Sequence, residues 1–450
     1  MNQSVLILYD PYCLYTMTVR EHLNSFKIHM DALVHYCSAV DDSIPLINLN
    51  DYDIIIIHYS IRVALGWHIS PHFDSALEQY EGILVMFVQD EYDNVHRTHS
   101  FIRKHQPQLF FTCVPKKYHN VIYPEKEFPT TKFVSNLTGY IPSKDNVHVK
   151  QWKPLEERIN IIGYRGRRLP AKYGNLGREK YIIARNVKEY CIKNNIGIDI
   201  EWEDEKRIYK DDWHDFISNC RSCLGTESGS NVFDFTGEIE TKTEAFKIEN
   251  PDANYDEIYL KFVEPYDDFI KMNQVSPRLF ECIAHGTILV LNEGEYSGIL
   301  KPGEHYLSLK KYFSNIGEVI DKLDNNMLCE TIRNNAYNDI IVSNDYSYKN
   351  FIHLVCHEVS NFLPTASSLP IKFKWNEDLY HKLLPRPSTY RIHGFSTDFP
   401  IDVSDYSLVN LPTTYIESKN KYPGFLVYLA PLFPKSLKTF IKRNFFGYNV

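Results

Sequence analysis

In the first 140 residues, short apolar runs that end in polar residues alternate with segments of helical apolar spacing. The clearest is Asp53–Ser60, which holds four consecutive isoleucines and closes with His58, Tyr59 and Ser60. Helical spacing of apolar residues separates such runs, as over Val19–Phe26. Strands apolar on both faces, alternating with helices, predict a parallel sheet covered on both sides. The other predicted strands are Val5–Tyr9, Ala32–Tyr36, Ile83–Val88, Leu109–Cys113 and Lys132–Leu137.

The same alternation starts again after a polar linker at 142–154. Its strands are Ile159–Tyr164, Gly197–Ile200, Ser222–Thr226, Ile288–Leu291 and Tyr306–Leu309. A chain of 450 residues is too long for one ordinary core. We therefore expect an α/β fold of two Rossmann-like domains, 1–148 and 149–360, facing a cleft and followed by an extension, 361–450. The acidic segment Glu238–Asp268 is expected to be a helix-poor insertion near that cleft.

Composition and charge narrow the class of protein. A net charge of −8 argues against a nucleic-acid partner, because phosphate binding needs clustered positive charge. Nine scattered cysteines fit a reducing compartment better than a disulfide framework, and Cys220 and Cys223 lack a second ligand pair for zinc. The N-terminus shows no secretory signal, and no apolar run reaches the length of a membrane span. These features predict a cytoplasmic protein.

The last thirty residues of the sequence are basic. Residues 421–450 carry five basic side chains and no acidic one, interleaved with aromatic and aliphatic residues. Such a segment can lie in a membrane interface with its lysines near anionic headgroups. We expect peripheral attachment at the inner face of the cytoplasmic membrane. The alternative is a helix packed back on the first domain.

Two loops that follow strands of the second domain carry candidate ligand-binding residues. In an open α/β sheet, ligands bind beyond the carboxyl ends of the strands. Arg165 and Arg167 follow the first of these strands, and guanidinium groups suit phosphate oxygens. Glu227, Ser228 and Gly229 follow another, where a carboxylate and small residues suit a sugar. The alternatives are a solvated basic turn and an ordinary Gly/Ser turn.

A third candidate lies on a predicted helix that opens at Ser276 and stops at Gly286. Arg278 and Glu281 are three residues apart and so share one face of this helix. Glu281 is placed to grip a ribose diol, and Arg278 to contact a phosphate or carboxylate. The alternative is a surface ion pair, which stabilises little.

The stretch Ser276–Thr287, followed by Glu293–Gly298 and Lys301–Tyr306, resembles the donor half of GT-B glycosyltransferases. The resemblance is to a bacterial group-1-like (CgeB-like) family. It implies a nucleotide-sugar donor held by Glu281, with Tyr296 and Ser297 in a donor-binding loop. It also implies sugar transfer, as by a hexosyltransferase, to a lipid-linked or surface polysaccharide acceptor such as lipopolysaccharide. Many retaining members carry a second glutamate where this chain has Asn273, so the stereochemical outcome stays open.

Catalytic candidates end two strands of the first domain. An inverting transferase needs a general base for the acceptor hydroxyl, and Asp90 and Glu91 are stronger candidates than His58. The letters of an Asp-x-Asp metal motif occur only at Asp51–Asp53, before a strand rather than after one. We therefore expect a metal-independent reaction without a cofactor.

Three other functions are weighed against this one. A nucleotide-sugar epimerase and a non-catalytic nucleotide- or sugar-binding scaffold both fit the same loops. A dinucleotide-dependent oxidoreductase is disfavoured, because no Gly-x-Gly-x-x-Gly lies between a strand and a helix.

Overall fold

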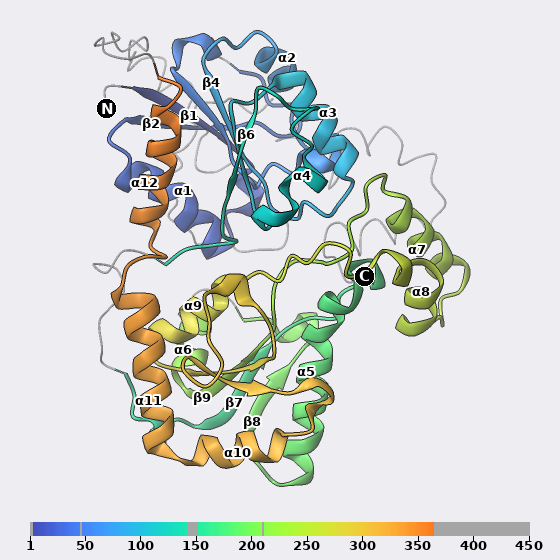
Figure 1. The fold of residues 1–450 in the computed structure, drawn as a ribbon, viewed down its shortest axis with the longest axis vertical. Helices are drawn as coiled ribbons and strands as arrows, with labels where there is room; N and C mark the ends of the chain where they lie inside the picture. The colour runs from blue at the N-terminus through green and yellow to red at the C-terminus, as the bar shows by residue number, and fades with distance from the viewer. Residues whose placement is uncertain (1–2, 46, 142–151, 209–210, 364–450) are drawn as a thin grey trace.

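The computed structural model describes residues 3–45, 47–141, 152–208 and 211–363. Within them the chain forms two parallel sheets flanked by helices, which confirms the predicted α/β class (Figure 1). Most of the predicted linker, and the whole segment 421–450, lie outside the described residues. No helix in the described part is long and apolar enough to span a bilayer.

The first sheet has six parallel strands in the order β2-β1-β3-β4-β5-β6. They are β1 (Ser4–Tyr9), β2 (Leu33–Ser38), β3 (Ile54–Ile57), β4 (Ile83–Phe87), β5 (Leu109–Thr112) and β6 (Lys132–Ser135). The helices between them are α1 (Met17–His29), α2 (Pro71–Leu77), α3 (Val95–His105) and α4 (His119–Ile122). Every strand predicted for this part of the chain is present.

The second sheet has five parallel strands in the order β11-β10-β9-β7-β8. They are β7 (Asn160–Arg165), β8 (Ile198–Glu201), β9 (Cys220–Gly225), β10 (Ile288–Asn292) and β11 (Tyr306–Leu309). Its helices are α5 (Gly174–Lys193), α6 (Asp211–Ser218), α9 (Pro277–Ala284), α10 (Ile316–Asp324) and α11 (Asn326–Ala336). These strands also match the predicted ones.

The insertion is helical, which corrects the expectation of a helix-poor segment. It contains α7 (Glu238–Glu249) and α8 (Tyr255–Phe262), which form a lobe on one side of the molecule (Figure 1). A capping box opens α8: Asn254 accepts from the Glu257 amide, and Glu257 accepts from the Asn254 amide. That Asn-x-x-Glu pattern was a readable helix start. The apolar residues of α7 do not line one face, so its periodicity gave no signal.

The root of this lobe touches both domains. The Asp234 amide donates to Tyr92 O (2.8 Å), and the Val95 amide donates to Asp234 O (3.2 Å). Lys172, just before α5, pairs with Glu240 of the lobe (2.5 Å) and with Asp93 of the first domain (3.6 Å). The insertion therefore lies at the boundary between the domains.

The chain crosses between the two domains twice, and the crossings lie side by side. The Ile141 amide donates to Tyr346 O (2.8 Å), and the Tyr348 amide donates to Ile141 O (2.9 Å). After the second crossing, α12 (Tyr348–Ser360) packs against α1 of the first domain (Figure 1). A helix from late in the chain thus covers the first sheet.

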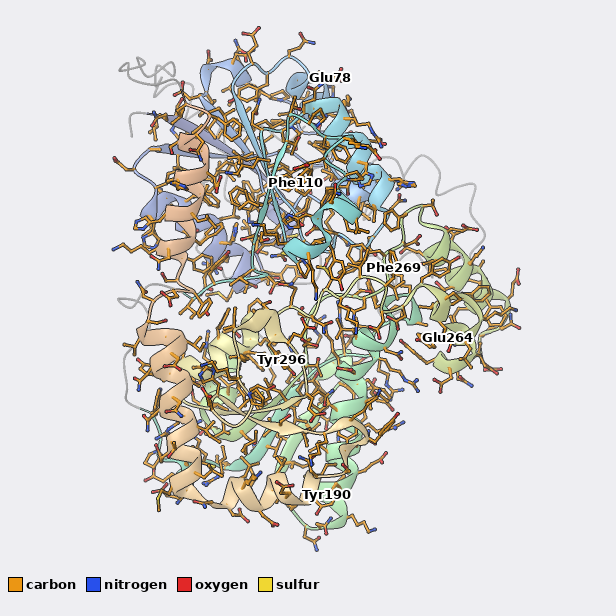
Figure 2. All side chains as sticks on the ribbon, in the orientation of Figure 1. Glu78, Phe110, Tyr190, Glu264, Phe269 and Tyr296 are labelled. Atoms are coloured by element: carbon orange, nitrogen blue, oxygen red, sulfur yellow. The ribbon has the colours of Figure 1, made fainter. Side chains whose placement is uncertain are left out.

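Alternate residues of each strand enter different cores, because both faces of each sheet are buried. In β1, Leu6 and Leu8 face the core under α2 and α3, whereas Val5 and Ile7 face α1 and α12. Phe110 of β5, labelled in Figure 2, is fully buried inside the first domain. This burial explains the continuous apolar runs of the sequence. It also leaves the strand ends as the places where polar side chains gather.

Candidate functional site

Helix α9 brings Arg278 and Glu281 to the edge of the second sheet that faces the first domain. Pro277 occupies its first turn, where the missing N–H costs nothing. The two side chains do not pair with each other. Arg278 Nη1 donates to Arg165 O (2.5 Å), and Trp213 Nε1 donates to Glu281 Oε2 (2.6 Å). Arg278 is exposed and Glu281 is half-buried, so both are available to a ligand.

An aromatic pair on α6 links these residues to Arg165. Trp213 stacks on Phe216, with ring centroids 5.7 Å apart. The Arg278 guanidinium lies 5.3 Å from the Trp213 ring, and that of Arg165 lies 4.3 Å from the Phe216 ring. Stacking of this kind fixes a guanidinium while leaving its edge free to donate. The predicted residues Arg165, Arg278 and Glu281 are therefore held by one assembly.

Arg165 differs from Arg278 because it already has a counterion. Its guanidinium pairs with Asp199 (2.8 Å) and donates to Asp199 O (3.1 Å). The pair is only 11% exposed on the arginine side. The phosphate role predicted for Arg165 remains a prediction, and its geometry favours a supporting position behind Arg278.

Arg167, Lys180 and Arg278 form a group that we call the cationic cluster. Arg167 and Arg278 are exposed, and Lys180 is half-buried on α5. Burial, followed by the charges of Arg167 and Arg278, lowers the pKa of Lys180 to about 8, whereas Asp90 acts in the opposite direction. Such mutual influence places these charges in one neighbourhood, which includes Asp90 of the first domain.

Within the described chain, no carboxylate forms an ion pair with a member of the cationic cluster. Neighbouring cations are paired instead: Arg165 with Asp199, Arg168 with Glu203 and Arg178 with Asp256. Positive charges gathered without counterions raise the local concentration of anions. The cluster is therefore suited to a polyanionic ligand.

The residues predicted for the donor loop also come together, but they bind one another. Glu227 Oε1 accepts from the Glu295 amide (2.7 Å) and the Tyr296 amide (2.8 Å). The Ser228 amide donates to Gln274 O (2.7 Å), and Ser297 Oγ donates to Gln274 Oε1 (3.0 Å). Burial raises the pKa of Glu227 to about 7, although the two amides lower it. These residues form a rigid floor beside α9.

The backbone of this floor is strained at several positions. Asn273, Tyr296 and Ser297 have φ values of 42°, 45° and 57°, which side-chain-bearing residues rarely adopt. Gly229 has φ 95°, and a Cβ there would lie 2.9 Å from Met272. Tyr296 itself is fully buried and marks the floor in Figure 2. Strain held by surrounding structure is typical of ligand sites.

In the first domain, Asp90 is the exposed member of the predicted catalytic set. It follows β4 with φ 52°, and Tyr92 Oη donates to its Oδ1 (2.5 Å). Gln89, one residue earlier, donates to Thr138 O (2.9 Å), and Thr138 Oγ1 donates to Val275 O just before α9 (2.6 Å). This chain of bonds connects the end of β4 to the residue just before Ser276 and α9 in the second domain.

His58 and Glu91 are buried within the first domain. Both ring nitrogens of His58 are engaged, with His22 (3.0 Å) and Ser60 (2.9 Å), and burial holds its pKa well below the ordinary value. Glu91 accepts from Thr112, Tyr123 and the Cys113 amide. Burial raises the pKa of Glu91 to about 7. Their catalytic roles remain predictions, and the geometry favours structural ones.

The Asp-x-Asp letters lie at the opposite edge of the first sheet. Asp53 Oδ2 accepts from the amide (2.9 Å) and hydroxyl (3.0 Å) of Ser4, at the start of β1. Among the described residues, no group of three or more His, Cys, Asp or Glu is arranged to hold a metal ion. Cys220 and Cys223 are buried on β9 as free thiols.

Sequence reasoning missed Lys180 and Trp213. Lys180 lies inside a helix with neither a motif nor a strand end beside it, and Trp213 resembles any apolar residue of an amphipathic helix. The sequence feature that could have indicated Trp213 is its position on the helix just before β9. No sequence pattern pointed to Lys180.

No family model matches the chain, and neither does any curated protein. Among solved structures, an alpha-glucosyltransferase in complex with UDP and a 13-mer DNA is 13% identical, with a TM-score of 0.48. The sucrose-phosphate synthase of Thermosynechococcus elongatus is 11% identical (TM-score 0.44), as is HepE of Anabaena in complex with UDP-glucose (TM-score 0.42). Each match covers 80% of this chain and 100% of the other. At identities of 11–13% this is a similarity of fold.

Proposed function

We propose that the protein is a glycosyltransferase that moves a sugar from a nucleotide-sugar donor to a glycan acceptor. The observation that carries the proposal is the convergence of Glu281 with the cationic cluster at one edge of the second sheet. A carboxylate suits a ribose diol, and unpaired cations suit a diphosphate. The two lie together because Trp213 contacts both Glu281 and Arg278.

The cationic cluster supplies the electrostatic part of the proposed mechanism. The departing nucleoside diphosphate gains negative charge as the bond to the sugar breaks. Fixed positive groups stabilise that charge in the transition state more than in the ground state. Arg167, Lys180 and Arg278 would supply this stabilisation in place of a divalent cation, so we propose a metal-independent reaction.

Asp90 is the proposed general base of the first domain. It is exposed, follows a strand of that sheet and lies in the electrostatic neighbourhood of Lys180. A carboxylate there can accept the proton of the acceptor hydroxyl as the hydroxyl oxygen attacks the anomeric carbon. This role requires an inverting reaction, which product stereochemistry would establish.

The acceptor we propose is a lipid-linked or surface polysaccharide glycan, such as lipopolysaccharide, built in the cytoplasm at the inner face of the membrane. The basic segment 421–450 supports attachment to an anionic surface. Cosedimentation of the full chain with vesicles containing anionic lipid tests this part. Equal binding to neutral vesicles would contradict it.

The donor site is tested by a thermal-shift screen of the purified chain with UDP, GDP, CMP, dTDP, ADP and NAD. We expect one sugar-carrier nucleotide to stabilise the protein, and Glu281→Gln to reduce that shift. Glu264→Gln is the matched control, because Glu264 is exposed on the lobe of the insertion, away from α9 (Figure 2). A shift with NAD alone, or an equal shift in Glu281→Gln, would contradict the proposal.

A further inference from the structure

We infer that Trp213 is a positioning residue that sets the recognition of ribose by fixing the carboxylate of Glu281. This inference rests on the proposed function and names a determinant of its specificity. Trp213 does not have to touch the nucleotide. It acts through the orientation of Glu281 and through its stacking with Arg278.

The indole is itself fixed in place. Trp213 is 9% exposed and belongs to an apolar core that also contains Ile217, Leu279 and Phe280. Its ring stacks on Phe216 at 28° between planes. A large ring packed on several sides has one orientation, so its N–H points in one direction.

That N–H holds one oxygen of the carboxylate. The distance from Trp213 Nε1 to Glu281 Oε2 is 2.6 Å. The terminal torsion of a free glutamate is broad, so an unheld carboxylate samples many orientations. In the described part of the chain Oε1 receives no protein donor, which leaves it for a ligand. A cis-diol needs two acceptor positions at fixed spacing. Oε1 and the remaining lone pair of Oε2 supply these positions, and a fixed carboxylate plane presents them at lower entropic cost.

The same ring also supports the anion side of the site. Arg278 lies over Trp213 and donates to Arg165 O (2.5 Å), which keeps the guanidinium at the end of β7. Replacing the indole with a phenyl ring keeps a stacking surface and removes the N–H. Trp213→Phe therefore separates the effect on the ribose from the effect on the phosphates.

The test compares each ribonucleotide with its 2′-deoxy counterpart. Dissociation constants for UDP, GDP and ADP and their 2′-deoxy forms are measured by calorimetry with the full chain. The wild-type protein is expected to prefer its ribonucleotide by roughly tenfold or more, as for a hydrogen bond to a charged group. Trp213→Phe should lose most of this preference while binding the 2′-deoxy form as the wild type does. Glu281→Gln should show the same loss, and the double variant should add nothing further.

Trp152→Phe is the matched control, because its indole N–H also bonds to α9. Trp152 Nε1 donates to Ala284 O at the far end of the helix (2.9 Å). If Trp213 merely anchored α9, both variants would lose the preference equally, which would overturn the inference. An unchanged preference in Trp213→Phe would also overturn it. Failure of the wild type to bind any of the nucleotides would instead overturn the proposed function, and this inference with it.

Discussion

The two sheets direct their polar strand ends toward the same boundary, but those ends differ in what their side chains do. In the first domain, His58 and Glu91 turn inward and satisfy buried partners. In the second, Arg167 after β7 and Arg278 in the first turn of α9 are exposed, and neither pairs with a carboxylate among the described residues. The position of a residue at a strand end therefore indicates the edge on which it lies. Its burial and its partners decide whether it can act on a ligand.

From this contrast we expect the largest loss of turnover when Asp90 is replaced, because it is the exposed acid among the catalytic candidates of the first domain. Asp90→Asn should lower turnover by roughly 10²–10⁴-fold, because the amide cannot accept a proton. Nucleoside diphosphate affinity should stay within about twofold, since the diphosphate is assigned to the second domain. Turnover is measured as nucleoside diphosphate release from the donor that the thermal-shift screen selects.

The same turnover assay applied to the two buried candidates, His58 and Glu91, shows whether burial separates them from Asp90. Glu91→Gln and His58→Gln should lower the melting temperature while the folded fraction keeps most of its turnover. If Glu91→Gln abolishes turnover at unchanged stability and Asp90→Asn does not, the two adjacent acids have been assigned the wrong way round.

Within the second domain, Arg165 and Arg278 form the next contrast. Arg278→Met should weaken nucleoside diphosphate binding by roughly tenfold to a hundredfold, as expected when a contact to a charged group is lost. Arg165→Met should mainly lower stability, because Tyr164 O and Asp199 O lose the guanidinium that donates to them. Calorimetry with the selected nucleotide and thermal unfolding separate the two effects. Equal losses of affinity would show that Arg165 reaches the phosphates itself.

The raised pKa of Glu91 predicts how the free energy of unfolding depends on pH. Its pKa is raised from 4.5 to about 7, so the folded protein holds a proton there that the unfolded chain releases. This contribution is present below pH 4.5 and is lost as the pH rises through about 7. Between pH 5 and 8 the unfolding free energy should fall by on the order of 2 kcal/mol more in the wild type than in Glu91→Gln. Denaturant unfolding measures both slopes, and parallel slopes would contradict the assignment.

Much of the fold follows from the sequence, because both faces of each sheet are buried. The apolar runs around Ile54–Ile57 and Ile288–Leu291 are short and buried on both faces, which favours interior parallel strands. The prediction that the insertion is poor in helix was wrong for a physical reason. Helix α7 buries few of its side chains, so its sequence lacks the periodicity from which helices are predicted.

The site was less predictable, because a motif states where a residue is attached and not what it contacts. Glu281 and Arg278 were found from their helix. Trp213, which donates to Glu281, comes from α6, and Lys180, whose pKa Arg278 lowers, comes from α5. Arg165 and Arg167 are two residues apart, and only one of them has a counterion in the structure. Nothing local to either arginine distinguishes them. The difference arises from Asp199 on the neighbouring strand β8.

The smallest expected effect is the pH dependence of nucleotide affinity caused by Lys180. It also tests whether the cationic cluster binds the nucleotide. Its pKa of about 8 means that its charge is lost as the pH rises from 7 to 9. Phosphate groups, with a second ionisation near about 6, keep their charge over this range. Affinity for the selected nucleoside diphosphate should therefore fall by roughly threefold between pH 7 and 9. In Lys180→Arg the guanidinium stays charged, so the affinity should become nearly independent of pH. The same fall in both proteins would assign the ionisation to another group and would separate Lys180 from the site that Arg167 and Arg278 form.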